Sequence, residues 1–268
     1  MRPFLSFNNS VLRRPDISVA IPNHEMTQPN GFTRYGDSVL LISDATQGAV
    51  WAVDLTNSDE PQVKRLIQDP TMMQNPSAPQ QLRFGINGIR ASVNTLFYCN
   101  SGFHTMWSLP LKAVKGSNIP ILAGPPRKLA DNCFYDDFAL DTDRGMLWVA
   151  SPAGAVIGVN IATGSQSVVA GVPGNLSAGI SAGTSAQPGA ADRYLYVTVI
   201  GSAAMVAPTG WRGLRRVDLF TLPSNGTVWW FFQRSEHIGD IQNYQILEGI
   251  LTGIIVAGII TRLIFMGD

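Results

Sequence analysis

Residues Val39-Leu40-Leu41-Ile42-Ser43-Asp44 form a short apolar run that ends in two small polar residues, and similar runs return three times along the chain. The later copies are Leu96-Phe97-Tyr98-Cys99-Asn100-Ser101, Met146-Leu147-Trp148-Val149-Ala150-Ser151 and Tyr194-Leu195-Tyr196-Val197-Thr198-Val199. Their matched leucines stand at positions 40, 96, 147 and 195, so the spacing is 56, 51 and 48 residues. This regularity indicates an internal repeat of about 50 residues.

A second apolar run follows each copy after a turn, as the partner strand of a hairpin would. These runs are Ala49 to Leu55, Thr105 to Leu111, Ala155 to Ile161 and Leu214 to Leu219. A repeat of about 50 residues made of short strands is typical of a β-propeller blade. One blade cannot bury both faces of its small sheet, so consecutive blades are expected to stack around a common axis.

The chain divides into three parts by composition. Residues 1–28 form a polar N-terminal extension with several prolines and one predicted strand, around Ile17 to Ile21. Residues 29–235 are the predicted propeller domain, and residues 246–266 form an apolar C-terminal segment. The predicted blades cover 29–69, 83–130, 131–171 and 191–220, with 172–190 as a long connection and Val228 to Phe232 as a further strand.

The segment 246–266 is interrupted only by Glu248 and Arg262. Its uncharged part, Gly249 to Thr261, is shorter than the ~18–20 residues of a membrane-spanning helix. The whole segment spans only if both charged side chains reach the interface. A membrane anchor, a buried strand or helix, and a stretch foreign to the fold therefore remain alternatives. Since residues 1–28 show no apolar signal-peptide region, we expect a cytoplasmic or C-terminally anchored protein.

Composition excludes several classes of function. The net charge is zero and only 14% of residues are charged, so no basic face for nucleic acid is expected. The two cysteines, Cys99 and Cys133, have no metal-ligand spacing and are expected to be buried free thiols. The chain also lacks the glycine-rich phosphate-binding loop, which argues against the common nucleotide-dependent chemistries.

Polar residues recur shortly before each repeated leucine, where the loops that lead into the innermost strands are predicted. The positions are Asn30, Asn87, Asp136 or Asp137, and Thr184 or Ser185. Because such loops meet at one mouth of a propeller, we expect these side chains to converge on the axis. They would bind a hard cation such as Ca²⁺, or a polar substrate. The alternative for the Asn-Gly pairs is ordinary turn chemistry.

Two further residues lie in the turn between strands of the second repeat. His104 is a candidate acid or base and Phe103 a candidate substrate contact, if this turn faces the mouth; a solvated turn histidine is the alternative. Aromatic residues could form the walls of a substrate pocket or belong to the blade cores: Phe32, Tyr98, Phe103, Trp107, Phe134, Tyr135 and Trp148.

The phrases PNGF, GAVWAVDL, GINGI, FYCNSG, DDFALD and DRYLYVTV resemble fungal members of the gluconolactonase-like six-bladed β-propeller superfamily, which includes senescence-marker-protein and strictosidine-synthase-like proteins. Within it, the chain is most similar to the hetero-Diels–Alderases of secondary metabolism. The resemblance covers residues 27–220 and implies a propeller that lacks one or two N-terminal blades, with a funnel-shaped site at one end.

In the lactonase branch of this superfamily, a Glu, two Asn and an Asp hold a divalent metal. The resemblance places Asn87 and Asp136 at an Asn and the Asp of that set. Asn30 lies one residue out of register with the other Asn, and Glu25 does not correspond to the Glu.

Three functions follow from these observations. The first is a ring-forming hetero-Diels–Alder cycloaddition of a polyketide or terpenoid substrate, which needs no cofactor. Here Asn87, His104 and Ser185 would be the catalytic residues, and Asn30, Phe103, Asp137 and Thr184 would bind substrate. The second is lactone hydrolysis with Ca²⁺ or another divalent cation at Asn87 and Asp136. The third is a non-catalytic or decayed propeller.

Overall fold

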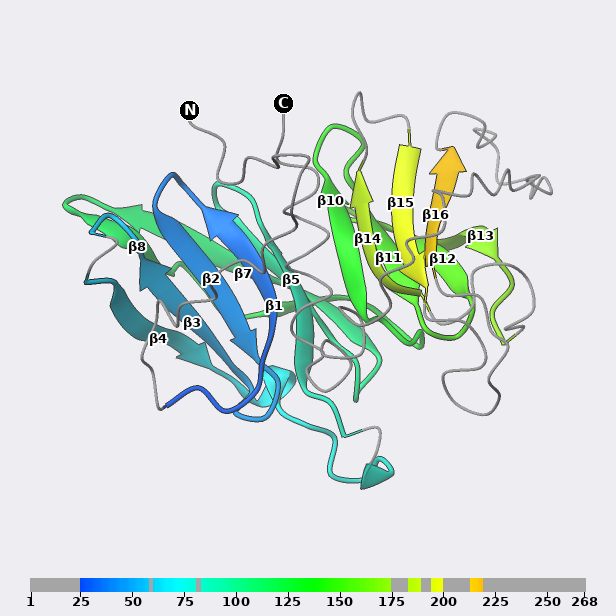
Figure 1. Ribbon diagram of the computed structural model, residues 1–268, viewed down its shortest axis with the longest axis horizontal. Coiled ribbons are helices and arrows are strands. Elements are labelled where there is room, and N and C mark those ends of the chain that lie inside the picture. Colours follow the sequence, from blue (N-terminus) through cyan, green and yellow to red (C-terminus); the bar gives the residue numbers. More distant parts are fainter. Residues whose placement is uncertain are drawn as a thin grey trace, which may run out of the picture.

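The computed structural model describes residues 25–57, 60–80, 83–174, 183–188, 194–199 and 213–218. These residues form antiparallel sheets and one short 3₁₀ helix, η1 (Pro70–Met72), and none of them lies in an α-helix. In Figure 1 the labelled strands from β1 to β8 lie on the left and those from β10 to β16 on the right, and the innermost strands contact one another in the order β1, β5, β10, β14. The predicted all-β, propeller-type fold is therefore confirmed.

Each sheet is a meander of consecutive strands, which we number as blades 1 to 4. Blade 1 comprises β1 (Pro29–Tyr35), β2 (Val39–Asp44), β3 (Ala49–Asp54) and β4 (Gln62–Gln68). Blade 2 comprises β5 (Ile86–Ala91), β6 (Thr95–Asn100), β7 (Thr105–Val114), β8 (Ser117–Leu122) and β9 (Arg127–Asp131). Blade 3 comprises β10 (Asp137–Asp141), β11 (Met146–Ser151), β12 (Ala155–Asn160) and β13 (Gln166–Gly171). Blade 4 comprises β14 (Gly183–Pro188), β15 (Tyr194–Val199) and β16 (Gly213–Asp218).

The repeated phrase forms the second strand of every blade, and in β6 and β11 both faces of that strand are buried. In β6, Leu96 and Tyr98 join the core between blades 1 and 2. Phe97 and Cys99, on the opposite face of the same strand, join the core between blades 2 and 3. Successive side chains of a strand point to opposite faces, so a strand between two sheets is apolar throughout. This explains the uninterrupted apolar runs of the sequence.

The structure differs from the sequence prediction at the innermost strands. The residues expected in loops before them lie largely inside strands β1, β5, β10 and β14, with Asp136 immediately before β10. Strand β14 also occupies part of 172–190, which was predicted as a connection, because the Gly, Ser and Ala residues there carry no apolar strand pattern. Strand β8, paired with β7, makes blade 2 larger than the repeat predicts.

Three parts of the prediction lie outside the described residues. These are the strand around Ile17 to Ile21, the strand Val228 to Phe232 and the apolar segment 246–266. Within the described ranges, no helix has the length and apolar character needed to cross a membrane.

Glycines let the innermost strands of neighbouring blades approach closely. A Cβ on Gly31 of β1 would lie 2.5 Å from the backbone oxygen of Asn87 in β5. A Cβ on Gly88 of β5 would lie 2.8 Å from the Cα of Asp137 in β10 and would also collide with the Asp137 carboxylate. Both positions therefore need a residue without a side chain, and the Asn-Gly pairs at 30–31 and 87–88 do more than make turns.

We expect Gly31→Ala and Gly88→Ala each to lower the free energy of unfolding by about 2–4 kcal/mol, because backbone atoms of the next blade must move to admit a methyl group. The control is Gly124→Ala, where the nearest atom to an added Cβ is a Pro110 side-chain carbon at 3.5 Å. Urea denaturation measures all three. Equal stability of the three variants would contradict the close packing of β1, β5 and β10.

Candidate functional site

One position near the start of the innermost strand is equivalent in all four blades, and in three of them it belongs to an irregularity in the strand pairing. In β1 the pairing with β2 shifts between Pro29 and Phe32, and in β5 the pairing with β6 shifts between Ile86 and Ile89. Each shift is a β-bulge that begins with an asparagine, Asn30 or Asn87. The pairing of β14 with β15 shifts in the same way, between Gly183 and Ser185.

Blade 3 has its equivalent just before β10. Asp137 pairs with Ala150 of β11, while the backbone N–H of Asp136 donates to the Ala150 oxygen at 3.2 Å. Asn30, Asn87, Asp136 and Thr184 are thus equivalent in the strand register. The structure describes the backbone of Thr184 and Ser185 but not their side chains.

Asn87 and Asp136 are in direct contact across the boundary between blades 2 and 3. The Asn87 Nδ2 donates to Asp136 Oδ1 at 2.6 Å and to Ser101 Oγ at 2.9 Å. Ser101 Oγ in turn donates to the Tyr135 backbone oxygen at 2.7 Å. Since the single hydroxyl proton of Ser101 goes to a carbonyl, Ser101 must accept from Asn87, and this fixes the orientation of the amide.

This orientation bears on the predicted metal site. The amide N–H groups of Asn87 point toward Asp136 and Ser101, so in this arrangement the pair does not offer a cation an amide oxygen and a carboxylate at one point. Among the described residues, no three His, Cys, Asp or Glu side chains gather in a metal-binding group. A cation here would require the amide to turn and Ser101 to exchange its partner, and the metal site stays a prediction.

The backbone of Asp136, like its side chain, is hydrogen-bonded to neighbouring residues. Its carbonyl accepts from the Gly88 N–H at 3.0 Å and from the Cys99 thiol at 2.9 Å. The side chain itself is only partly buried, whereas Asn87 is 6% exposed. Burial, assisted by the neighbouring Asp137 charge, raises the pKa of Asp136 to about 7, although the Asn87 hydrogen bond opposes the shift. Asp136 therefore changes its charge near neutral pH.

Asp137 is paired with a residue that sequence reasoning missed. Arg90 of β5 lies 2.8 Å from Asp137 Oδ2, and the two side chains are 9% and 17% exposed. The Arg90 guanidinium also donates to the Ile89 oxygen and lies 5.5 Å from the centre of the Phe138 ring. Asp137 therefore joins blades 2 and 3, and its contact with a substrate stays a prediction. A charged residue inside an apolar strand was the signal for Arg90, because such a residue is expected to be paired.

The turn after β6 lies at the same end of blade 2 as Asn87, since it begins with Ser101. Within it, Phe103 is 44% exposed, and the His104 ring stacks on Phe134 at 5.2 Å. Of the predicted pocket walls, Tyr98, Tyr135 and Trp148 are instead blade-core residues. Phe103 and His104 belong to the turn that begins with Ser101, which bonds to Asn87, and Phe134 stands shortly before Asp136 in the chain.

Asn30 lies in β1, one residue before Gly31, which packs against the Asn87 backbone. Ser43 of β2 fixes this junction: its Oγ accepts from the Gly31 N–H and donates to the Asn87 oxygen, both at 2.7 Å. The contacts between innermost strands thus run from β1 through β5 to β10, and β10 continues to β14.

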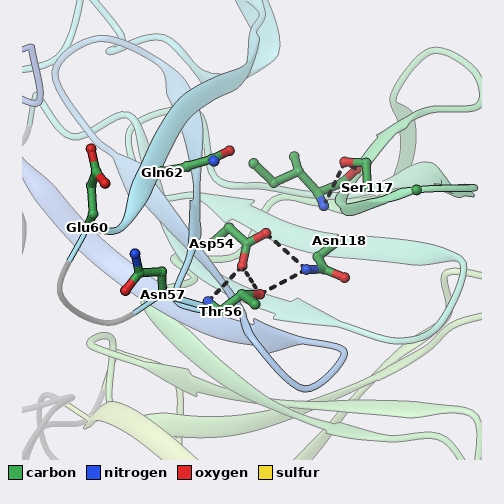
Figure 2. Close-up of a pocket in the computed structure, with 9 residues that line it drawn as sticks. Asp54, Thr56, Asn57, Glu60, Gln62, Ser117 and Asn118 are labelled. Atoms are coloured by element: carbon green, nitrogen blue, oxygen red, sulfur yellow. Dashed lines mark hydrogen bonds between the residues drawn. The ribbon is translucent and has the colours of Figure 1, made fainter.

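A second feature lies away from these strands. Asp54, Glu60 and the β7–β8 hairpin around Asn118 line an open cavity of about 310 Å³ between blades 1 and 2 (Figure 2). Asp54 accepts from Thr56 and Asn118, and the Thr56 hydrogen bonds hold the pKa of this exposed carboxyl below its usual value. The hydrogen bond from Asn118 of β8 to Asp54 of β3 links blades 1 and 2 at their outer edge.

The raised pKa of Asp136 predicts a pH-dependent stability difference. Because the folded value near 7 exceeds the ordinary value of 3.8, its stabilising contribution is complete below about pH 4 and is lost as the pH rises through 7. Asp136→Asn keeps an acceptor for Asn87 and removes the titration. We expect this variant to gain a few kcal/mol over the wild type between pH 5 and pH 8 in urea denaturation. A pH-independent difference would contradict the assignment.

Comparison with known proteins establishes the fold alone. The sequence matches no protein-family model and no curated protein. Among solved structures, a candidate 6-phosphogluconolactonase of Bacteroides fragilis is 13% identical over 75% of this chain and 55% of its own, with a TM-score of 0.53. A candidate 6-phosphogluconolactonase of Bacteroides uniformis is 12% identical over 72% of this chain and 53% of its own, with a TM-score of 0.48. A structure of a nidogen/laminin complex is 13% identical over 74% of this chain and 62% of its own, with a TM-score of 0.49. The chain thus spans only about half to three fifths of the length of these solved chains. The likeness to the first of them is one of fold alone, in agreement with the β-propeller architecture.

Proposed function

We propose that the protein is a small-molecule enzyme that opens lactone rings, with Asp136 as the general base. The observation that carries this proposal is the Asn87–Asp136 pair, at 2.6 Å, at the start of the innermost strands of blades 2 and 3. A carboxylate whose pKa lies near 7 is well suited to take a proton from water at neutral pH. Its partial exposure leaves it open to a substrate.

The step is a simple hydrolysis. Ionised Asp136 takes a proton from a water molecule as the water oxygen attacks the lactone carbonyl carbon. The ring C–O bond then breaks, and the leaving oxygen takes the proton, so that a hydroxy acid is formed and Asp136 is restored. Asn87 holds the carboxylate in place, and Ser101 holds Asn87. The likeness of the fold to a candidate 6-phosphogluconolactonase supports this reaction class.

The second candidate function is a ring-forming cycloaddition of a polyketide or terpenoid substrate, as in secondary metabolism. Two observations favour it. In its protonated form, Asp136 can donate a hydrogen bond to an oxygen that gains negative charge in the transition state. Exposed Phe103 and the stacked His104–Phe134 pair offer aromatic surface for an apolar substrate.

The two functions require opposite charge states of Asp136, so their pH profiles differ in sign. We expect hydrolysis of a panel of simple lactones to rise with pH through about 7, since the base must be ionised. Asp136→Asn should lower kcat/KM by about 10²–10⁴-fold. The control Asp143→Asn, in the exposed turn between β10 and β11, should leave the rate unchanged.

The cycloaddition would be supported, and the base mechanism overturned, if the protein closes the ring of a heterodiene substrate and this activity falls as the pH rises through 7. Hydrolysis that Asp136→Asn leaves intact would overturn both roles of this carboxyl. Hydrolysis that depends on added Ca²⁺, and that a chelator abolishes, would support the cation-assisted lactonase.

A further inference from the structure

The turn between β6 and β7 holds a histidine in an unusual backbone conformation. His104 has a φ of 55°, in the left-handed region that residues with a side chain rarely adopt. By strand register it is the last turn residue before the third strand of blade 2, and the same position in blades 1 and 3 is Gly48 and Gly154. Both glycines also have a positive φ, 62° and 98°. Blade 2 therefore carries an imidazole where the neighbouring blades use a glycine.

The side chain of His104 does not explain this choice by stabilising the turn. Its ring makes no hydrogen bond to the described part of the chain. Instead it stacks on Phe134, with 5.2 Å between the ring centres and 24° between the planes. Residues with a side chain that are held in rare backbone conformations gather at active sites and ligand clamps. The stack is therefore a candidate for ligand contact.

The stack belongs to an aromatic surface that faces solvent. His104 is exposed and Phe134 is half-buried. Phe103, the preceding residue of the turn, is 44% exposed, and it is the one aromatic residue among the exposed large apolar side chains of the described ranges. We call Phe103, His104 and Phe134 the aromatic shelf. Its rings present flat apolar faces to whatever enters from solvent.

The aromatic shelf is joined to the Asn87–Asp136 pair through a single hydroxyl group. Ser101 begins the turn that carries the first two residues of the shelf, and its Oγ accepts from Asn87 Nδ2 at 2.9 Å. The same Oγ donates at 2.7 Å to the oxygen of Tyr135, which separates Phe134 from Asp136 in the chain. The shelf and the proposed general base therefore stand at the same end of blades 2 and 3.

Hydrogen bonds fix the turn in place without a ligand. Asn100 Oδ1 accepts from the Phe103 N–H at 3.1 Å, and Asn100 Nδ2 donates to the Thr71 oxygen at 2.9 Å. Asn75 Nδ2 donates to the Gly102 oxygen, also at 2.9 Å. A surface that is already ordered loses little conformational entropy when a ligand binds to it. The turn thus holds its aromatic rings ready for a flat ligand.

We propose that the aromatic shelf binds a planar aromatic ring of the substrate, so that the site selects lactones that carry such a ring over purely aliphatic ones. The reaction rests on the proposed function, but the binding can be measured without it. Aromatic rings stack favourably on one another, beyond the gain from buried area alone. An aliphatic lactone has no flat ring and does not gain this contact.

The test uses unreactive lactams, which keep the ring and the carbonyl group of a lactone but resist hydrolysis. The aromatic probe is dihydrocarbostyril, the lactam of dihydrocoumarin, and its aliphatic match is valerolactam. Ligand-observed NMR titration of the full chain measures both dissociation constants. We expect the aromatic lactam to bind about tenfold more tightly, which corresponds to the upper range of one ring stack.

Two variants identify the surface that gives this preference. In Phe134→Leu and in His104→Gly we expect the affinity for dihydrocarbostyril to fall about fivefold, with the affinity for valerolactam unchanged. Because glycine adopts the left-handed conformation freely, His104→Gly should not lower the melting temperature, and its loss of binding then has no cause in unfolding. The control is Val93→Ala, at an 80% exposed position in the turn between β5 and β6, which should change neither affinity.

Equal affinities for the two lactams, or a preference that both variants retain, would overturn the proposal. Hydrolysis of dihydrocoumarin is the separate readout for the proposed function. Binding of the aromatic lactam at the shelf, in a protein that does not open dihydrocoumarin, would contradict the lactone hydrolysis and support the aromatic ring site. Hydrolysis of dihydrocoumarin and of valerolactone at equal kcat/KM, unchanged in both variants, would support the hydrolysis and overturn the ring site.

Discussion

The close approach of the innermost strands is the constraint on which the rest of the structure depends. Gly31 lies against the Asn87 backbone and Gly88 against Asp137, so three consecutive blades meet with almost no side chain between their backbones. This contact fixes the angle at which the blades splay outward, and the apolar cores between them fill the remaining space. It also brings the polar residues beside those glycines together, which is why packing and candidate chemistry share the same few positions.

Polar groups at the boundary between blades 2 and 3 compensate one another. Arg90 and Asp137 form an ion pair that is mostly shielded from water, and Ser101 and Cys99 donate to backbone oxygens of blade 3. Buried polar groups cost free energy unless they are hydrogen-bonded, so this network is expected to hold the blades in one register. Asp136 is the exception. Its raised pKa means that ionisation of this carboxyl lowers the stability of the fold. Groups of this kind are common at functional sites.

The strand repeat was predictable because the second strand of each blade is largely apolar on both sides. These apolar runs can be recognised from the sequence alone. The adjacency of Asn87 and Asp136 also followed, since equal phase in a repeat means equal position around an axis. The Arg90–Asp137 pair did not follow, because the partner of a charged residue depends on register between strands 47 residues apart. Strand β14 was missed because Gly183 to Pro188 has neither β-branched apolar residues nor alternation, and it pairs through tertiary context alone.

The bulge at the start of the innermost strands determines what a substitution at that position does to the protein. At Asn30 and Asn87 the residue lies in a bulge, outside the strict alternation of the strand. One chain already carries Asn, Asn, Asp and Thr at this point in its successive blades. Substitution there changes the chemistry offered at the inner end of a blade and, where the side chain is bonded across blades as at Asn87 and Asp136, also the stability of the fold.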